Sequence, residues 1–211
     1  MINFRVTGEN IYFRPTIEAD MATIATAVTG AKMGVWGRDQ LPSVNEQKNM
    51  WWYWNQQNEE LFGKRNLQLG DHVQLTLTIC KKSDDSVVGY THQKIHGKIV
   101  SFKMVGIIPS ERRNGYYKEA NILRHRMAFD GMGATKTTVV IPTTDAPPFA
   151  TAVRGMLDNL YNVRNTKVQE IEGRGVYRGT IITAAEWNTW LDHSDQASLK
   201  AHAYSLTWAS S

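Results

Sequence analysis

Residues 105–117 read Val105-Gly106-Ile107-Ile108-Pro109-Ser110-Glu111-Arg112-Arg113-Asn114-Gly115-Tyr116-Tyr117. The apolar start is typical of a strand, which Pro109 ends, and the polar segment leads through Gly115 into a helix. Such a loop directs the unpaired N–H groups and the positive dipole end of the helix at whatever lies beyond the strand. That is the physical make-up of a pyrophosphate site. One glycine between a strand and a helix is also common in ordinary connections, so the surrounding segments must decide between the two.

The segments after this loop alternate between helix and strand. Ala120, Leu123 and Met127 recur at helical spacing, which predicts a helix over 116–130 that Gly131 ends. A β-branched run then predicts a buried strand. The elements expected downstream are this strand over 137–141, a helix over about 145–160, strands over 167–171 and 176–182, and a short helix over 184–191.

The segments before the loop predict two helices and an antiparallel group of strands. Asp20 is expected to cap the first helix, which starts at Met21. Ser43 and Glu46 form a capping-box pattern at the start of a second helix over 44–62. The strands are expected over 11–15, 73–79, 87–92 and 99–108, with polar turns between the last three.

The composition is that of a globular protein with one domain of ordinary size. Of 211 residues, 42% are hydrophobic and 21% charged, and no apolar run approaches the length of a membrane span. The first residues lack the apolar segment of a secretory signal. Cys80, the only cysteine, is expected to be a buried apolar residue and cannot form an internal disulfide. We therefore expect a cytoplasmic location.

The charge pattern narrows the classes of partner. A net charge of +4 and a pI near 9.1 suit an anionic ligand. Lys and Arg form no run of five or more, so no nucleic-acid partner is expected, and no membrane partner is expected either. The His, Cys and carboxylate positions show no metal-ligand spacing, so we expect no metal site.

Over residues 10–185 the order of these elements resembles the GNAT superfamily (GCN5-related N-acetyltransferases). Phe13-Arg14-Pro15 with Asp20 is similar to that family's first strand and helix, and Phe129-Asp130-Gly131-Met132-Gly133-Ala134 to its turn after the third helix. Arg112-x-x-Gly115 matches the first half of its phosphate-loop pattern. The resemblance implies an α/β fold, with a mixed central sheet of about six to seven strands and helices on both faces. It also implies an acyl-CoA-binding domain over 1–185 and a C-terminal extension over 186–211.

The same resemblance implies acetyl-CoA as the co-substrate. In such proteins the backbone amides of the loop hold the pyrophosphate, while the strand over 98–108 splays from the strand over 137–141. The pantetheine then pairs with the strand groups left free by the splay. The cofactor-binding residues implied are Val105, Gly106, Ile107, Arg112, Arg113, Asn114, Gly115, Tyr116 and Tyr117.

The sequence departs from the family pattern at three points. Tyr117 stands where the loop has Gly or Ala, and strand 98–108 contains no Asp or Glu to act as a general base. Leu157 occupies the place of the tyrosine that protonates the leaving thiolate, and Tyr161 lies one helical turn farther on. Tyr161 is therefore one catalytic candidate. The other is His92, whose neutral imidazole could accept an amine proton, although such histidines, like His96, are more often structural.

Two functions remain open from the sequence. The first is an N-acetyltransferase in which a primary amine, on a small molecule or a protein, attacks the acetyl thioester directly. The second is a GNAT-fold protein without catalysis, acting as a structural or interaction module such as a virion component. The tail over 201–211 bears on the second, because Tyr204, Leu206 and Trp208 alternate like one face of a strand. We expect this tail to pack on the protein's own sheet or on a partner chain within an oligomer or larger assembly.

Overall fold

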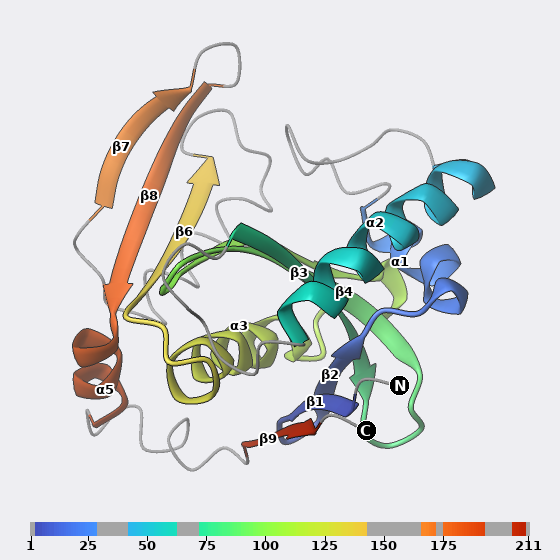
Figure 1. Ribbon diagram of the computed structural model, residues 1–211, viewed down its shortest axis with the longest axis horizontal. Helices are drawn as coiled ribbons and strands as arrows, with labels where there is room; N and C mark the ends of the chain where they lie inside the picture. The colour runs from blue at the N-terminus through green and yellow to red at the C-terminus, as the bar shows by residue number, and fades with distance from the viewer. Residues whose placement is uncertain are drawn as a thin grey trace.

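A mixed β-sheet forms the centre of the protein (Figure 1). The computed structural model describes residues 3–28, 42–62, 72–142, 166–171, 175–192 and 204–209. These residues form a nine-stranded sheet in the order β7-β8-β6-β5-β4-β3-β2-β1-β9. The strands are β1 Asn3–Thr7, β2 Ile11–Pro15, β3 His72–Lys81, β4 Val87–His96, β5 Ile99–Ile107, β6 Lys136–Pro142, β7 Thr166–Ile171, β8 Gly175–Thr183 and β9 Ser205–Ala209.

Helices cover both faces of this sheet, which confirms the predicted fold class (Figure 1). α3 lies on one face, while α1 and α2 lie on the other. None of the helices in the described ranges combines the length and hydropathy that crossing a bilayer requires. The helices are α1 Met21–Val28, α2 Val44–Phe62, α3 Tyr116–Arg126 and α5 Ala184–Asp192, with short turns η1 Glu18–Asp20, η3 Pro109–Glu111 and the π turn η4 Met127–Gly131.

The sheet has more strands than predicted, and the difference lies at its β1–β9 edge. β1 was not predicted, although Phe4 and Val6 are buried while Arg5 between them is exposed, an alternation visible in the sequence. β9 pairs antiparallel with β1 along its whole length. Tyr204 and Leu206 pack against the main core, so the tail packs on the protein's own sheet, one of its two predicted positions. The predicted domain division at residue 185 stays a prediction, although β9 joins the same sheet.

Two apolar clusters fill the space between sheet and helices. The larger cluster joins the sheet to α3 and includes Trp187 of α5. The smaller joins Met21, Ile24 and Ala27 of α1 to Trp54 of α2 and Tyr90 of β4. Burial of this area supplies most of the favourable free energy of folding, and the polar contacts below determine where each helix lies.

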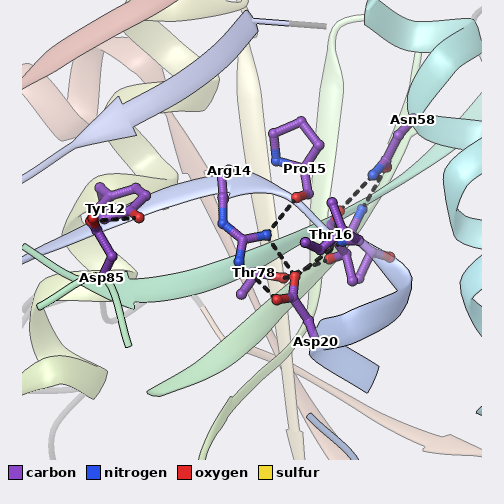
Figure 2. A network of polar contacts seen from close by, with 10 residues as sticks. Tyr12, Arg14, Pro15, Thr16, Asp20, Asn58, Thr78 and Asp85 are labelled. Carbon is purple, nitrogen blue, oxygen red and sulfur yellow. Dashed lines mark hydrogen bonds and ion pairs between the residues drawn. The ribbon is translucent and has the colours of Figure 1, made fainter. Parts of the chain in front are cut away.

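A buried carboxylate fixes the start of α1 on the sheet (Figure 2). Both terminal nitrogens of Arg14 donate to Asp20, at 2.6 and 2.7 Å, and the Thr78 hydroxyl donates to it at 2.7 Å. Asp20 was predicted as the N-cap of the first helix, and this was wrong. It is the last residue of η1, and its carboxylate accepts from the N–H of Ile17 at 3.0 Å. The carboxylate therefore links β2 and β3 to the segment that enters α1.

A side-chain amide holds α2 against the sheet. The pairing of β2 with β3 ends at Pro15 opposite Leu77. Thr76, the residue before Leu77 on β3, therefore has no partner on β2. Asn58 of α2 takes its place: its amide donates to the Thr76 carbonyl at 2.7 Å and accepts from the Thr76 N–H at 3.0 Å. The capping box predicted at the start of α2 is confirmed, with Ser43 and Glu46 bonded in both directions.

Asp20→Asn should destabilise the protein by about 3 kcal/mol, because it leaves the Arg14 guanidinium without its charged partner in a largely buried position. Urea unfolding monitored by tryptophan fluorescence would measure the loss. Glu18→Gln is the matched control, since it removes the same charge from an exposed position in the same turn. Equal stabilities for the two variants would contradict the structural role given to Asp20.

Candidate functional site

The two central parallel strands separate halfway along their length. Residues 99–102 of β5 pair with residues 136–139 of β6, and this is the parallel pair at the middle of the sheet. β5 continues to Ile107 and β6 to Pro142, yet within the described chain no pairing joins them beyond Phe102 and Val139. In Figure 1, β6 runs with β8 and β7 away from β3 and β4. The expected splay is therefore present, and it leaves an edge of β5 without a neighbouring strand.

A β-bulge lies where this separation begins. His92 of β4 faces Met104 while its neighbour Gln93 faces Phe102, so Lys103 is an extra residue in β5. An extra residue bends its strand and leaves local backbone groups out of the ladder. The bulge thus turns β5 immediately after its last pair with β6.

A buried arginine from α3 supports the bulge. Arg124 donates from Nη1 to the Met104 carbonyl at 3.1 Å and from Nη2 to Asn121 Oδ1 at 2.7 Å. Its guanidinium lies 4.2 Å from the centre of the Phe102 ring. Sequence reasoning did not identify Arg124 as important. Its place four residues after Ala120, on the apolar stripe of α3, was the available signal.

The predicted phosphate loop adopts a left-handed backbone at two residues. Arg113 has φ +72°, and Gly115, the N-cap residue of α3, has φ +82°. A Cβ added to Gly115 would meet nothing within 4 Å, so the space before the helix is open. Arg112 turns back instead, and its Nε donates to the Ile107 carbonyl at 3.0 Å. The loop thus presents the start of α3 to open space, with Arg113 exposed beside it.

An ion pair anchors the same loop to the sheet. Lys81 at the end of β3 contacts Glu111 at 2.8 Å, and this bond raises the pKa of Lys81. Asn114 also donates to Glu111, at 3.2 Å. The charge of Glu111 is therefore offset by a lysine, which lowers its repulsion toward an anion bound by the loop.

The tyrosines after the glycine pack inward. Tyr116 and Tyr117 lie against the main core, and burial raises the pKa of Tyr117. The departure from the family pattern at Tyr117 therefore places a large, partly buried side chain against the core.

The strand segment predicted to face the pantetheine is buried on both faces of the sheet. Val105, Gly106 and Ile107 all lie in the interior. A Cβ at Gly106 would lie 2.7 Å from a ring carbon of Tyr90 and 3.3 Å from Ala27, so glycine allows α1 and Tyr90 to approach β5 closely.

His92 lies on the α1–α2 face beside the bulge. Its Nδ1 is 2.7 Å from the Thr76 hydroxyl, and its ring centre is 6.2 Å from that of Trp54. Burial lowers its pKa to about 4, with smaller contributions from Lys94 and Lys103. His92 is thus neutral at physiological pH.

The remaining candidates lie elsewhere. Tyr161 and Leu157 fall outside the described residues, and Tyr161 stays a prediction. His96 pairs with His72 at an exposed end of the sheet, 2.9 Å apart between their Nδ1 atoms. Cys80 is buried, as predicted, and burial raises the pKa of its thiol, which disfavours the reactive thiolate. In the described ranges, no three His, Cys, Asp or Glu side chains are placed to share a metal ion.

Several solved structures are similar to this chain in fold. RimJ of Mycobacterium smegmatis, in complex with CoA-disulfide, is similar at 15% identity and a TM-score of 0.66, over 93% of each chain. Apo FdhC, a nucleotide-linked sugar GNAT, is similar at 14% identity and a TM-score of 0.65, over 92% of this chain and 98% of that one. A GNAT-family acetyltransferase from Bacillus anthracis is similar at 11% identity and a TM-score of 0.63, over 86% of this chain and 99% of that one.

These likenesses show the fold: the chain has the GNAT fold that its sequence resembles. No family model matches the sequence, and no curated protein matches it either.

Acid should destabilise the protein through two histidines that stay neutral when folded. Burial lowers the pKa of His92 to about 4 and that of His125, in the core under α3, to about 3. The unfolded chain takes up their protons near pH 6.5, so the free energy of unfolding should fall by up to about 1.4 kcal/mol per pH unit for each histidine as pH drops from 6.5 toward 4.

His92→Gln should make the free energy of unfolding depend less steeply on pH, because only the contribution of His125 remains. Urea unfolding of both proteins at pH 7, 6, 5 and 4 would measure it. Parallel stability curves for the variant and the parent would show that His92 does not titrate abnormally.

Proposed function

We propose that the protein is an acetyl-CoA-dependent N-acetyltransferase. The observation that carries the proposal is the separation of β5 from β6 directly beside an open helix N-terminus. A strand edge and an amide-lined helix start are the two groups that a long, pyrophosphate-bearing thioester requires. The GNAT fold adds support, because acetyltransferases with this fold are among the similar structures.

The pyrophosphate would bind at the loop before α3. Gly115 opens the approach to the first N–H groups of the helix, and Arg113 adds an exposed positive charge next to them. Arg112 would act mainly through the backbone, since its Nε already holds the Ile107 carbonyl. The pantetheine would then follow the free edge of β5 along 105–107 toward the bulge.

The chemistry would be a direct displacement. The lone pair of a neutral amine attacks the thioester carbonyl, and the developing oxyanion accepts from a backbone N–H of β5. The C–S bond then breaks, the thiolate takes a proton to become CoA, and the nitrogen loses its proton to water or a base. Tyr161 remains the proposed donor to the thiolate.

His92 is a poor base for this step. An alkylammonium has a pKa of about 10, whereas that of His92 is lowered to about 4. β5 carries no Asp or Glu that could serve instead. The amine is therefore expected to lose its proton to solvent before it attacks, and catalysis would come from alignment and oxyanion stabilisation.

A non-catalytic GNAT-fold module is the alternative function, and acetyl-CoA binding separates the two. The absence of a carboxylate on β5 is what favours this alternative. Titration calorimetry with acetyl-CoA should show one site per chain if the proposed function holds. A chain that binds no CoA ester at millimolar concentration would overturn the enzyme proposal.

Arg113→Ala should weaken acetyl-CoA binding by about 1 to 3 kcal/mol, because the variant loses one charge-assisted hydrogen bond to a phosphate. Lys136→Ala is the matched control, since it removes the same charge from the exposed start of β6, at the paired end of the strand. Calorimetry of the parent and both variants provides the measurement. A similar loss for the two variants would mean that general charge, and not the loop, attracts the ligand.

Gly115→Ala should block acetyl-CoA while the protein still folds. The new Cβ meets no protein atom, so the cost to stability is about 1 kcal/mol from the left-handed backbone, but it enters the space where a phosphate would approach the N–H groups. Gly133→Ala carries the same kind of cost at φ +67°, also with nothing within 4 Å, beyond the other end of α3. If both variants bound acetyl-CoA equally well, the loop would be only a connection.

A further inference from the structure

Among the described residues, those on one face of the sheet beside the bulge are buried, and those on the other face are more open to an acceptor amine. On the α3 face, beside the bulge, Gln93, Phe102 and Arg124 are all buried, so this side is filled by protein. On the α1–α2 face, His92 and Met104 are half-buried, and the neighbouring bulge residue Lys103 is exposed. Solvent reaches the bulge on this second face, and an acceptor would therefore meet these side chains.

Two lysines lie close to His92 on the accessible face. Lys94 is two residues after His92 on β4, and alternate residues of a strand share a face. Lys103 is the extra residue of the bulge, next to the Met104 that faces His92. Both lysines lower the pKa of His92, and Lys94 also lowers that of Lys103, which places the three groups within electrostatic reach of one another.

No acidic side chain offsets these charges in the part of the chain described. The ion pairs found there join other residues: Arg14 with Asp20, and Lys81 with Asp84 and Glu111. β4 and β5 themselves carry no Asp or Glu. The approach to the bulge is therefore a positive region without a counter-ion from the described residues.

The hydrogen bond of His92 adds a donor to this region. Its Nδ1 lies 2.7 Å from the Thr76 hydroxyl, which has a proton to donate. When the hydroxyl donates to Nδ1, the proton of the neutral imidazole resides on Nε2. Nε2 then offers an N–H beside two ammonium groups, an arrangement suited to an oxyanion.

We propose that the acceptor is an amine that also carries an anionic group, a carboxylate or a phosphate, bound by Lys103, Lys94 and the Nε2–H of His92. This inference rests on the proposed acetyltransferase function and names its substrate class. The same positive charges lower the pKa of the incoming ammonium, so they favour the neutral amine that attacks the thioester. They disfavour polyamines, whose second charge would have no partner among the described residues of this face.

The test compares acceptors of similar length and different charge. The probes are 4-aminobutyrate, 3-aminopropyl phosphate and 1,4-diaminobutane, with acetyl-CoA and release of the CoA thiol as the readout of kcat/KM. We expect the carboxylate, the phosphate or both to exceed the diamine by at least about tenfold, as one charge-assisted contact implies. The preferred anionic probe shows whether the site recognises a carboxylate or a phosphate.

Variants of Lys103 tie the preference to this face. Lys103→Gln should reduce the preference for the anionic acceptor about tenfold, mainly through KM, and leave the Kd for acetyl-CoA unchanged. Lys103→Arg should retain the preference because it keeps the charge. Lys98→Gln, an exposed lysine in the turn between β4 and β5, is the matched control. Should Lys103→Gln not fold, Lys94→Gln serves the same purpose.

The outcomes separate this inference from the function on which it rests. A protein that binds acetyl-CoA and acetylates the diamine as fast as the anionic amines would overturn the inference and leave the acetyltransferase function standing. Unchanged selectivity in both Lys103→Gln and Lys94→Gln would do the same. A protein that binds no acetyl-CoA and acetylates none of the probes would overturn both.

Discussion

The bulge at Lys103 is the feature on which the architecture of the site depends. Two parallel strands that remain paired leave no free edge, and an extra residue in one of them is a direct way to part them. The bulge follows the last β5–β6 pair by a single residue, so the bend and the separation coincide. Arg124 stabilises the bulge from the α3 side of the sheet by donating a hydrogen bond to the Met104 carbonyl. A buried cation in the core thus supports an opening on the other side of the sheet.

Buried polar side chains set the positions of the helices around that opening. Asp20 fixes the entry to α1, and Asn58 fixes α2 to β3. Glu119 of α3 accepts from the backbone N–H groups of Asn10 and Ile11, which ties the helix behind the loop to the β1–β2 turn. Unpaired, each of these groups would be costly to bury, and each is satisfied by partners on particular neighbouring segments. The apolar core supplies most of the stability, while these hydrogen bonds determine where the helices lie on the sheet.

The electrostatics of the accessible face suit a displacement without a strong general base. His92 is neutral, and it lies beside two lysines that have no counter-ion in the part of the chain that the structure describes. This environment favours uncharged amines and stabilises negative charge. The transfer would depend on alignment between β5 and the loop before α3, with solvent as the acceptor of the first proton.

Local patterns in the sequence determined most of the secondary structure and the position of the candidate loop. Alternation predicted β3, and polar turns marked the starts of β4 and β5. Helical spacing predicted α3, and the Ser43–Glu46 box marked the start of α2. Each of these patterns depends on residues only a few positions apart. The resemblance also anticipated the splay of β5.

Only the tertiary structure decided the contacts that join distant segments. The inward packing of Tyr117, the role of Arg124 and the pairing of the tail with β1 depend on residues far away in the sequence. The true role of Asp20 is of the same kind, since one of its partners, Thr78, lies 58 residues away. A carboxylate before a helix predicts a cap from local propensity alone. Its burial under the hydroxyl of Thr78 on β3 is a property of the assembled sheet, and no local window of sequence contains both residues.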